Sequence, residues 1–161
     1  MTGGAQKVSV CLWFDTQAEE AATFYTSLLP NSRVVAVSRY GANQPMPEGT
    51  ALTVAFELDN ASFMALNGGP HFKLTEAASI AVRCDTQAEI DTLWSRLLED
   101  GGVEQQCFWL KDRFGLSWQV VPSQLEQWMR SDKIAAARVM SVMMGSVKAD
   151  IAKLQRAYDG T

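Results

Sequence analysis

The chain has 161 residues (17.7 kDa) and a formal net charge of −4, a length that fits one domain or two small similar halves. Its composition, 47% apolar and 20% charged, excludes a disordered chain, and the lack of any run of about 18 apolar residues excludes a membrane-spanning helix. The acidic balance argues against a nucleic-acid partner, because phosphate recognition needs a basic face.

Cysteine usage and the N-terminal residues bear on the compartment. The three cysteines, Cys11, Cys84 and Cys107, form no CxxC pair, and His71 is the sole histidine. This pattern predicts neither a disulfide framework nor a zinc site. The first ten residues, MTGGAQKVSV, lack the apolar core of a signal peptide, so a reducing cytoplasm is expected. Cys11 and Cys84 fall within predicted strands and are expected to be buried.

An internal repeat organises the sequence. Residues 15–19 read Asp-Thr-Gln-Ala-Glu, and residues 85–89 read the same. Each copy follows an apolar run, Val8–Phe14 in one case and Ser79–Cys84 in the other, and each opens a helical pattern. Because the context matches on both sides, we interpret the repeat as a duplication.

Both copies predict a helix start. Thr16 and Glu19, and likewise Thr86 and Glu89, have the spacing of a capping box. The aspartate before each threonine is an alternative cap. Helical spacing of apolar residues follows each copy, and the two helices are expected to stop at Pro30 and at Gly101-Gly102.

Strand patterns follow each helix and repeat in the second half. The predicted strands after the first helix are 33–40, 51–58 and 62–66, and those after the second are 103–106, 108–111 and 117–121. Each half therefore reads β-α-β-β-β. The prediction is one α+β domain over 1–161, built from paired βαβββ modules at 6–70 and 71–122.

The segment 123–161 differs from both halves and is predicted to be a helical tail. Leu125, Trp128 and Met129 indicate a short helix, Asp132 a cap for a second, and an apolar stripe continues to Tyr158. The methionines of this stripe could form a ligand wall, because methionine adapts to irregular surfaces. Core packing or a subunit contact is the simpler interpretation.

Three stretches resemble the PhnB-like, 3-demethylubiquinone-9 3-methyltransferase-like proteins. They are Leu-Trp-Phe-Asp-Thr-Gln-Ala-Glu-Glu-Ala from residue 12, Ala-Leu-Asn-Gly-Gly-Pro from residue 65, and residues 109–122. That group belongs to the vicinal oxygen chelate superfamily, with glyoxalase I, bleomycin-resistance proteins and extradiol dioxygenases. The resemblance covers nearly the whole chain and implies the glyoxalase/bleomycin resistance/dioxygenase-like fold, association as a homodimer and a divalent metal in the sheet cleft.

The resemblance also implies where metal ligands would lie. The implied positions, one on the first and one on the last strand of each half, fall on Val8 or Val10, near Ala65, on Ser79 and on Gln119. Only Gln119 carries a donor that the superfamily uses, and one amide does not hold a catalytic divalent ion. We therefore expect no metal and no other cofactor, and a cleft that binds a small organic ligand.

Strand alternation predicts which residues face that cleft. Residues in step with the implied positions are Val10, Leu12, Phe14, Ala65, Asn67, Ser79, Ala81, Arg83, Ser117, Gln119 and Val121. The candidate ligand-binding residues are Phe14, Asn67, Arg83, Trp109 and Gln119, and the ligand would be anionic or aromatic. Each has a structural alternative: Arg83 pairing with a carboxylate, Asn67 serving the Gly68-Gly69 turn, and Trp109 packing in the core.

Other functions stay open at this stage. A metal-dependent lyase, isomerase or dioxygenase could use a shifted site, with His71 beside Glu57 or Glu76 and Gln119 as a further weak metal candidate. An interaction protein could dimerise through its sheets and its tail. Methyl transfer is disfavoured, because both strand-to-helix turns lack the glycines that S-adenosylmethionine needs in a Rossmann-like fold.

Overall fold

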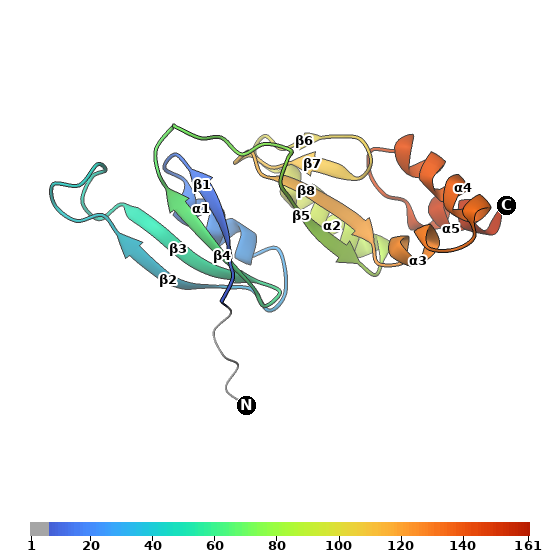
Figure 1. Cartoon of the computed structure of the whole chain (residues 1–161), viewed down its shortest axis with the longest axis horizontal. Helices are drawn as coiled ribbons and strands as arrows, with labels where there is room; N and C mark the ends of the chain where they lie inside the picture. Colours follow the sequence, from blue (N-terminus) through green and yellow to red (C-terminus); the bar gives the residue numbers. More distant parts are fainter. Residues whose placement is uncertain (1–6) are drawn as a thin grey trace, which may run out of the picture. The chain divides into compact units, whose positions relative to one another are not determined.

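The computed structural model describes residues 7–161 and divides into two compact units, one reaching Leu74 and the other running from Thr75 to Thr161. Figure 1 follows the chain from blue to red. The predicted module boundary at 70–71 falls, like this division, in the segment between β4 and β5. Residue 6, where the first module is predicted to begin, lies outside the described residues.

The first unit holds one sheet and one helix, as predicted. Its elements are β1 (Val10–Phe14), α1 (Ala18–Thr26), β2 (Arg33–Arg39), β3 (Ala51–Leu58) and β4 (Ala61–Asn67). The strand order is β1-β4-β3-β2, with β1 parallel to β4 and the other pairs antiparallel. Parallel pairing of β1 and β4 is possible because α1 and two further strands separate them in sequence.

Helix α1 covers one face of this sheet. The Tyr25 ring lies 6.3 Å from the Phe56 ring of β3, so the residues in register with Phe56 belong to the same face. Leu12 and Phe14 are both 4% exposed on that face. Burial of such large apolar side chains contributes roughly 2 kcal/mol each. The core of the unit therefore lies between α1 and the sheet.

The start of α1 corrects the sequence prediction. Thr16 makes no cap, and Gln17 is the N-cap residue, with no side-chain cap hydrogen bond. Instead Asn67 Oδ1 accepts a hydrogen bond from the Ala18 N–H at 2.8 Å. Glu19 does not reach back, because its carboxylate binds the Arg39 guanidinium at 2.7 and 2.9 Å.

The second unit repeats the arrangement. Its elements are β5 (Ser79–Cys84), α2 (Gln87–Leu98), β6 (Val103–Glu104), β7 (Trp109–Lys111) and β8 (Ser117–Pro122). The strand order β5-β8-β7-β6, with β5 parallel to β8, matches that of the first sheet. Helix α2 buries Ile90, Leu93, Trp94 and Leu97, and the face it covers includes the buried Leu110, Trp118 and Val120.

Strand β6 is shorter than predicted because the chain turns sharply after it. Cys107 and Phe108 have φ values of +62° and +69°, in the left-handed region that disfavours non-glycine residues. Their N–H groups donate to the carbonyls of Ser146 and Val147, at 2.9 Å each, rather than continuing a strand ladder. The turn thus fixes the tail to the second sheet.

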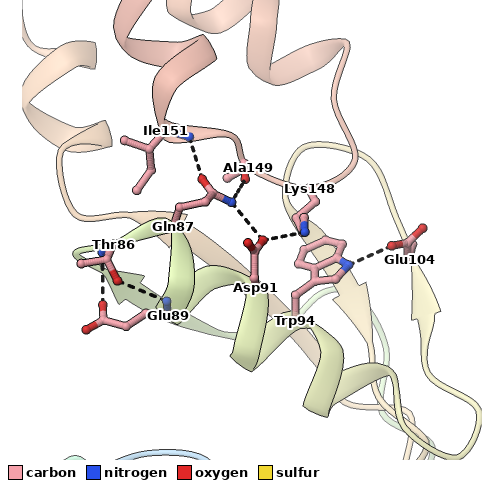
Figure 2. Close-up of polar contacts among 9 residues, drawn as sticks. All are labelled: Thr86, Gln87, Glu89, Asp91, Trp94, Glu104, Lys148, Ala149 and Ile151. Atoms are coloured by element: carbon pink, nitrogen blue, oxygen red, sulfur yellow. Dashed lines mark hydrogen bonds and ion pairs between the residues drawn. The ribbon is translucent and has the colours of Figure 1, made fainter.

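The capping box predicted for α2 is confirmed. Thr86 Oγ1 accepts from the Glu89 N–H at 3.2 Å, and Glu89 Oε2 accepts from the Thr86 N–H at 3.3 Å (Figure 2). The same Glu89 oxygen accepts from the Asp85 N–H at 2.7 Å. Three N–H groups at this end thus have side-chain acceptors.

The tail is helical, as predicted, and the stripe beyond Gly145 forms a separate third helix: the helices are α3 (Leu125–Met129), α4 (Lys133–Met144) and α5 (Ile151–Asp159). Asp132 caps α4, accepting from the N–H groups of Ile134 and Ala135 at 2.9 and 3.0 Å. Arg138 joins α4 to α5 by donating to the carbonyls of Ala157 and Tyr158. None of the helices described in residues 7–161 is long and apolar enough to cross a membrane.

The Gln87 side chain holds the tail against α2. Gln87 Nε2 donates to the Ala149 carbonyl at 3.0 Å, and Gln87 Oε1 accepts from the Ile151 N–H at 2.9 Å. Nearby, Lys148 Nζ lies 2.6 Å from Asp91 Oδ1. Figure 2 shows these contacts converging on the N-terminal half of α2. Gln87 Nε2 also donates to Asp91 Oδ1 at 3.0 Å. Lys148 lowers the pKa of Asp91 most, followed by Gln87.

Candidate functional site

The face of the second sheet opposite α2 carries most of its polar side chains. Register places Lys111, Ser117 and Ser79 in one row across β7, β8 and β5. Trp109, Gln119 and Ala81 form the next row, and Val121 pairs with Arg83 beyond it. The alternate residues face α2. We call this the polar face, defined by Ser79, Arg83, Trp109, Lys111, Ser117 and Gln119.

All the residues of this sheet that alternation predicted to face the cleft lie on the polar face. Arg83, Trp109 and Gln119 are among them, from three different strands. Their contact with a ligand stays a prediction. The sequence analysis did not name Lys111 as a site residue, because strand pairing across the sheet decides which residues lie beside it. The local signal for its face was its position two residues after Trp109, since such residues lie on the same side of a strand.

The two polar residues at implied metal positions bind each other. Gln119 Nε2 donates to Ser79 Oγ at 2.9 Å. Next to them, the Ser117 side chain is fully buried, and its Oγ has no hydrogen-bond partner among the described residues. This hydroxyl therefore keeps one donor and its acceptor lone pairs available.

An ion pair lies at the same end of the polar face. Lys111 Nζ contacts the Glu76 carboxylate, and Gln105 Nε2 donates to the same oxygen, Glu76 Oε1, at 3.2 Å. Lys111 is the largest cause that lowers the pKa of Glu76, followed by the Glu76 backbone and Gln105. Glu76 is thus held in its ionised form.

Arg83 lies at the opposite end of the polar face. It pairs with a carboxylate, which is the structural alternative that the sequence left open. Its guanidinium pairs with Glu126 of α3 at 3.6 Å, and its side chain is 71% exposed. The same glutamate binds Arg130 at 2.7 Å. An open pocket of about 650 Å³ adjoins this pair, lined by Ser123, Glu126, Gln127, Arg130, Ser131 and Tyr158.

Two predicted site residues of the first unit face the wrong side for a cleft opposite the helix. Phe14 is 4% exposed and Asn67 1% exposed, both on the face that α1 covers. Both polar atoms of the Asn67 side chain bind the backbone: Oδ1 accepts from the Ala18 N–H at 2.8 Å, and Nδ2 donates to the Ala51 carbonyl at 2.9 Å. The facing prediction was therefore off by one residue here, which reverses the side for every residue of a strand.

Where β1 pairs with β4, the opposite face of the first sheet carries the apolar residues Cys11, Trp13, Met64 and Leu66. Trp13 Nε1 donates to the Gly69 carbonyl at 2.9 Å, and its ring meets Phe72 edge-on, with centroids 4.9 Å apart. A Cβ on Gly68 would lie 2.1 Å from the Trp13 ring, so only glycine fits there. Cys11 is exposed, which corrects its predicted burial.

Neither Cys84 nor Cys11 offers an activated thiolate. Cys84 is buried, and its pKa is raised to about 11, first by burial and then by the charges of Glu89 and Asp85. Partial burial also raises the pKa of Cys11. A nucleophilic cysteine needs the opposite shift.

The donor set does not fit a divalent ion. No three His, Cys, Asp or Glu side chains in residues 7–161 lie close enough together to hold one. His71 is exposed on its loop, while Glu57 pairs with Arg33 at 2.9 Å and Glu76 with Lys111. At the implied positions of the second sheet, the available donors are one hydroxyl and one amide, which bind each other. Metal sites need three or four good ligands.

Two four-stranded mixed sheets, each built as βαβββ, define the glyoxalase/bleomycin-resistance-like fold of the vicinal oxygen chelate superfamily. A family model described as 3-demethylubiquinone-9 3-methyltransferase matches residues 6–121. The chain belongs to this family, which confirms both the predicted fold and the resemblance.

Solved structures share this fold. A PhnB protein from Bacillus cereus, described as a 3-demethylubiquinone-9 3-methyltransferase, is 37% identical; the match covers 73% of this chain and 100% of that one, with a TM-score of 0.68. Protein PA1353 from Pseudomonas aeruginosa is 22% identical, with 73% and 98% covered and a TM-score of 0.59. The fosfomycin resistance protein FosX from Listeria monocytogenes is 12% identical, with 80% and 100% covered and a TM-score of 0.56, which shows the fold alone. No curated protein matches the sequence.

Proposed function

We propose that the chain binds a small organic molecule on the polar face and does so without a metal ion. The observation that carries this proposal is the hydrogen bond between Gln119 and Ser79, which joins the two polar side chains at implied metal positions. Gln119 Oε1, the half-buried Trp109 ring and the buried Ser117 hydroxyl then supply an acceptor, an apolar surface and an unused polar group. A few polar groups beside an aromatic surface are typical of ligand sites.

The predicted contacts divide accordingly. Arg83, Trp109 and Gln119 belong to the proposed site. Phe14 and Asn67 do not, because both side chains are buried beneath α1 and the Asn67 amide is used by the backbone.

The names of related proteins suggest two other activities, which the residues of this chain support less well than ligand binding. Methyl transfer in the Rossmann manner needs a glycine-rich strand-to-helix turn, whereas both turns here read Asp-Thr-Gln-Ala-Glu. A FosX structure from Listeria monocytogenes is described as a complex with Mn(II) and sulfate, at 12% identity to this chain. The donor set described above does not fit such an ion, so we derive no metal-dependent step.

Metal content and ligand binding test the proposal together. Protein purified without metal-affinity resin is expected to contain far less than one divalent ion per chain by mass spectrometry. A thermal-shift screen of small acids and aromatic compounds should then find stabilising ligands, because a ligand at 100 times its Kd adds about 2.7 kcal/mol.

Variants connect that binding to the site. Gln119→Leu and Trp109→Ala are expected to lose the ligand-induced shift, while Gln155→Leu, a change on exposed α5, should keep it. A stoichiometric ion that Gln119→Leu releases would contradict the proposal.

We also propose that the protein acts in the cytoplasm as a homodimer. All three cysteines are free, as expected in a reducing compartment. Helix α4 exposes Ile134, Met140 and Met144, and such apolar surface favours association. Light scattering after gel filtration measures the mass, and Met144→Lys should shift a dimer towards monomer.

A further inference from the structure

The first row of the polar face combines a cation with two hydroxyls. Lys111, Ser117 and Ser79 are register partners on three neighbouring strands, so their side chains share one face. Ser117 Oγ is fully buried and has no partner in the part of the chain that the structure describes. A hydroxyl in this position can donate to an anion that also contacts the lysine.

A carboxylate already lies beside this row. Glu76, in the segment that precedes β5, places its Oε1 against Lys111 Nζ and the Gln105 amide. Its side chain is 50% exposed and that of Lys111 is 32% exposed. Exposed ion pairs are weak and are screened by salt, so another anion can replace Glu76 at modest cost.

The next row supplies an apolar surface. Trp109 precedes Lys111 by two residues on β7, so the two side chains leave the same face about 7 Å apart. This spacing suits a molecule with a flat ring and one carboxylate. A single ammonium, one hydroxyl and one amide are too few donors to neutralise a phosphate dianion, which favours a carboxylate over a phosphate.

We propose that Glu76 is an internal occupant of a carboxylate site, and that a small aromatic carboxylate displaces it to bind Lys111 and Ser117 with its ring against Trp109. This inference rests on the proposed function, whose site it shares. Binding and displacement are reversible and involve no covalent step.

Calorimetric titration with benzoate tests the inference, with benzamide as the neutral probe of the same shape. Glu76→Gln should bind benzoate about two- to fivefold more tightly than the wild type, because the competing charge is gone. Lys111→Met should weaken benzoate binding by about tenfold or more, and Ser117→Ala by about two- to threefold. Benzamide affinity should change little in Glu76→Gln and Lys111→Met.

Arg96→Met is the matched control, since Arg96 is a cation of α2, on the other face of the same sheet, where it pairs with Glu99 at 3.3 Å. It should leave benzoate affinity unchanged. If Lys111→Met does not fold by circular dichroism, Lys111→Gln replaces it, and Glu76→Gln alone still tests displacement because glutamine matches the shape of glutamate.

Four outcomes overturn the inference. Equal benzoate affinity in the wild type and Glu76→Gln would rule out displacement, and loss of binding in Arg83→Met alone would place the anion at Arg83. Ligands that depend on Gln119 and Trp109 but not on Lys111 would refute the carboxylate site while the proposed function stands. If neither benzoate nor any compound of the thermal-shift screen binds, the proposed function fails as well.

Discussion

The two halves begin their helices with the same five residues but cap them differently. In the second half, Thr86 and Glu89 form a reciprocal capping box. In the first half, Thr16 makes no cap, and the Asn67 carboxamide from β4 binds the first N–H of the helix. A local sequence therefore offers a cap, and its surroundings decide whether the cap forms.

The surroundings of each glutamate explain the difference. Glu19 is held by Arg39 of β2, so its carboxylate is turned away from the backbone. Glu89 forms no ion pair within residues 7–161 and reaches back to the helix start. Gln17 and Gln87 diverge in the same way: among the described residues the Gln17 side chain accepts only from the neighbouring Thr16 N–H, whereas Gln87 binds the tail.

The largest effect in this comparison is expected at Asn67. Asn67→Ala should lower the free energy of unfolding by about 2 to 4 kcal/mol, because the Ala18 N–H and the Ala51 carbonyl both lose a buried partner. Urea denaturation measures the change. Ser117→Ala removes a buried hydroxyl that has no partner among the described residues and should not destabilise the protein. Equal effects in the two variants would refute this account of Asn67.

The paired glutamines come next. Gln87→Ala should lower the free energy of unfolding by about 1 to 2 kcal/mol and speed amide exchange at Ile151, since the tail loses two hydrogen bonds. Gln17→Ala should change stability by less than about 0.5 kcal/mol, because that side chain is exposed. Hydrogen exchange followed by mass spectrometry locates the effect. Uniform faster exchange across the chain would argue against a local clamp.

The paired threonines test the caps themselves. Thr86→Ala should cost about 1 kcal/mol, the usual contribution of an N-cap. Thr16→Ala should be nearly neutral, because Thr16 caps nothing. Thermal unfolding of both variants gives the comparison, and a larger loss at Thr16 would show that a capping box forms there in solution.

The smallest effect concerns pH. The pKa of Asp91 is lowered below 3.8, chiefly by Lys148. A carboxyl whose pKa is lower in the folded state adds stability above its unfolded pKa and loses it as the pH falls through its folded pKa. Tail amides should therefore exchange faster below about pH 4. In Asp91→Asn this part of the pH dependence should vanish, and an unchanged profile would contradict the assignment.

The sequence predicted the elements well because they depend on local patterns. Helical periodicity, the repeat and the turn residues marked every strand and all helices but α5, which was not separated from α4. Further errors lie at the end of β6, at the start of α1 and at its end, which falls at Thr26 and not just before Pro30. Faces were harder. In β5 the run Ser-Ile-Ala-Val-Arg-Cys alternates small or polar with apolar residues, and the predicted face was right.

In β1 the run Val-Cys-Leu-Trp-Phe is apolar on both sides, so alternation did not mark a face. The contacts of Glu76 and Lys111 depend on pairing across the sheet and on a segment before β5, and neither leaves a local signature. Likewise, nothing near Asn67 in the sequence indicates that it caps a helix 49 residues earlier.

The left-handed turn at Cys107 and Phe108 has a consequence for how related sequences can vary. Two successive non-glycine residues with positive φ are costly, by roughly 1 to 3 kcal/mol each, and here their N–H groups bind Ser146 and Val147 of the tail. The turn and the tail are therefore expected to vary together. Across an alignment, relatives that have lost the tail should show glycine or a deletion at this turn, and those that keep the tail should keep the turn's length.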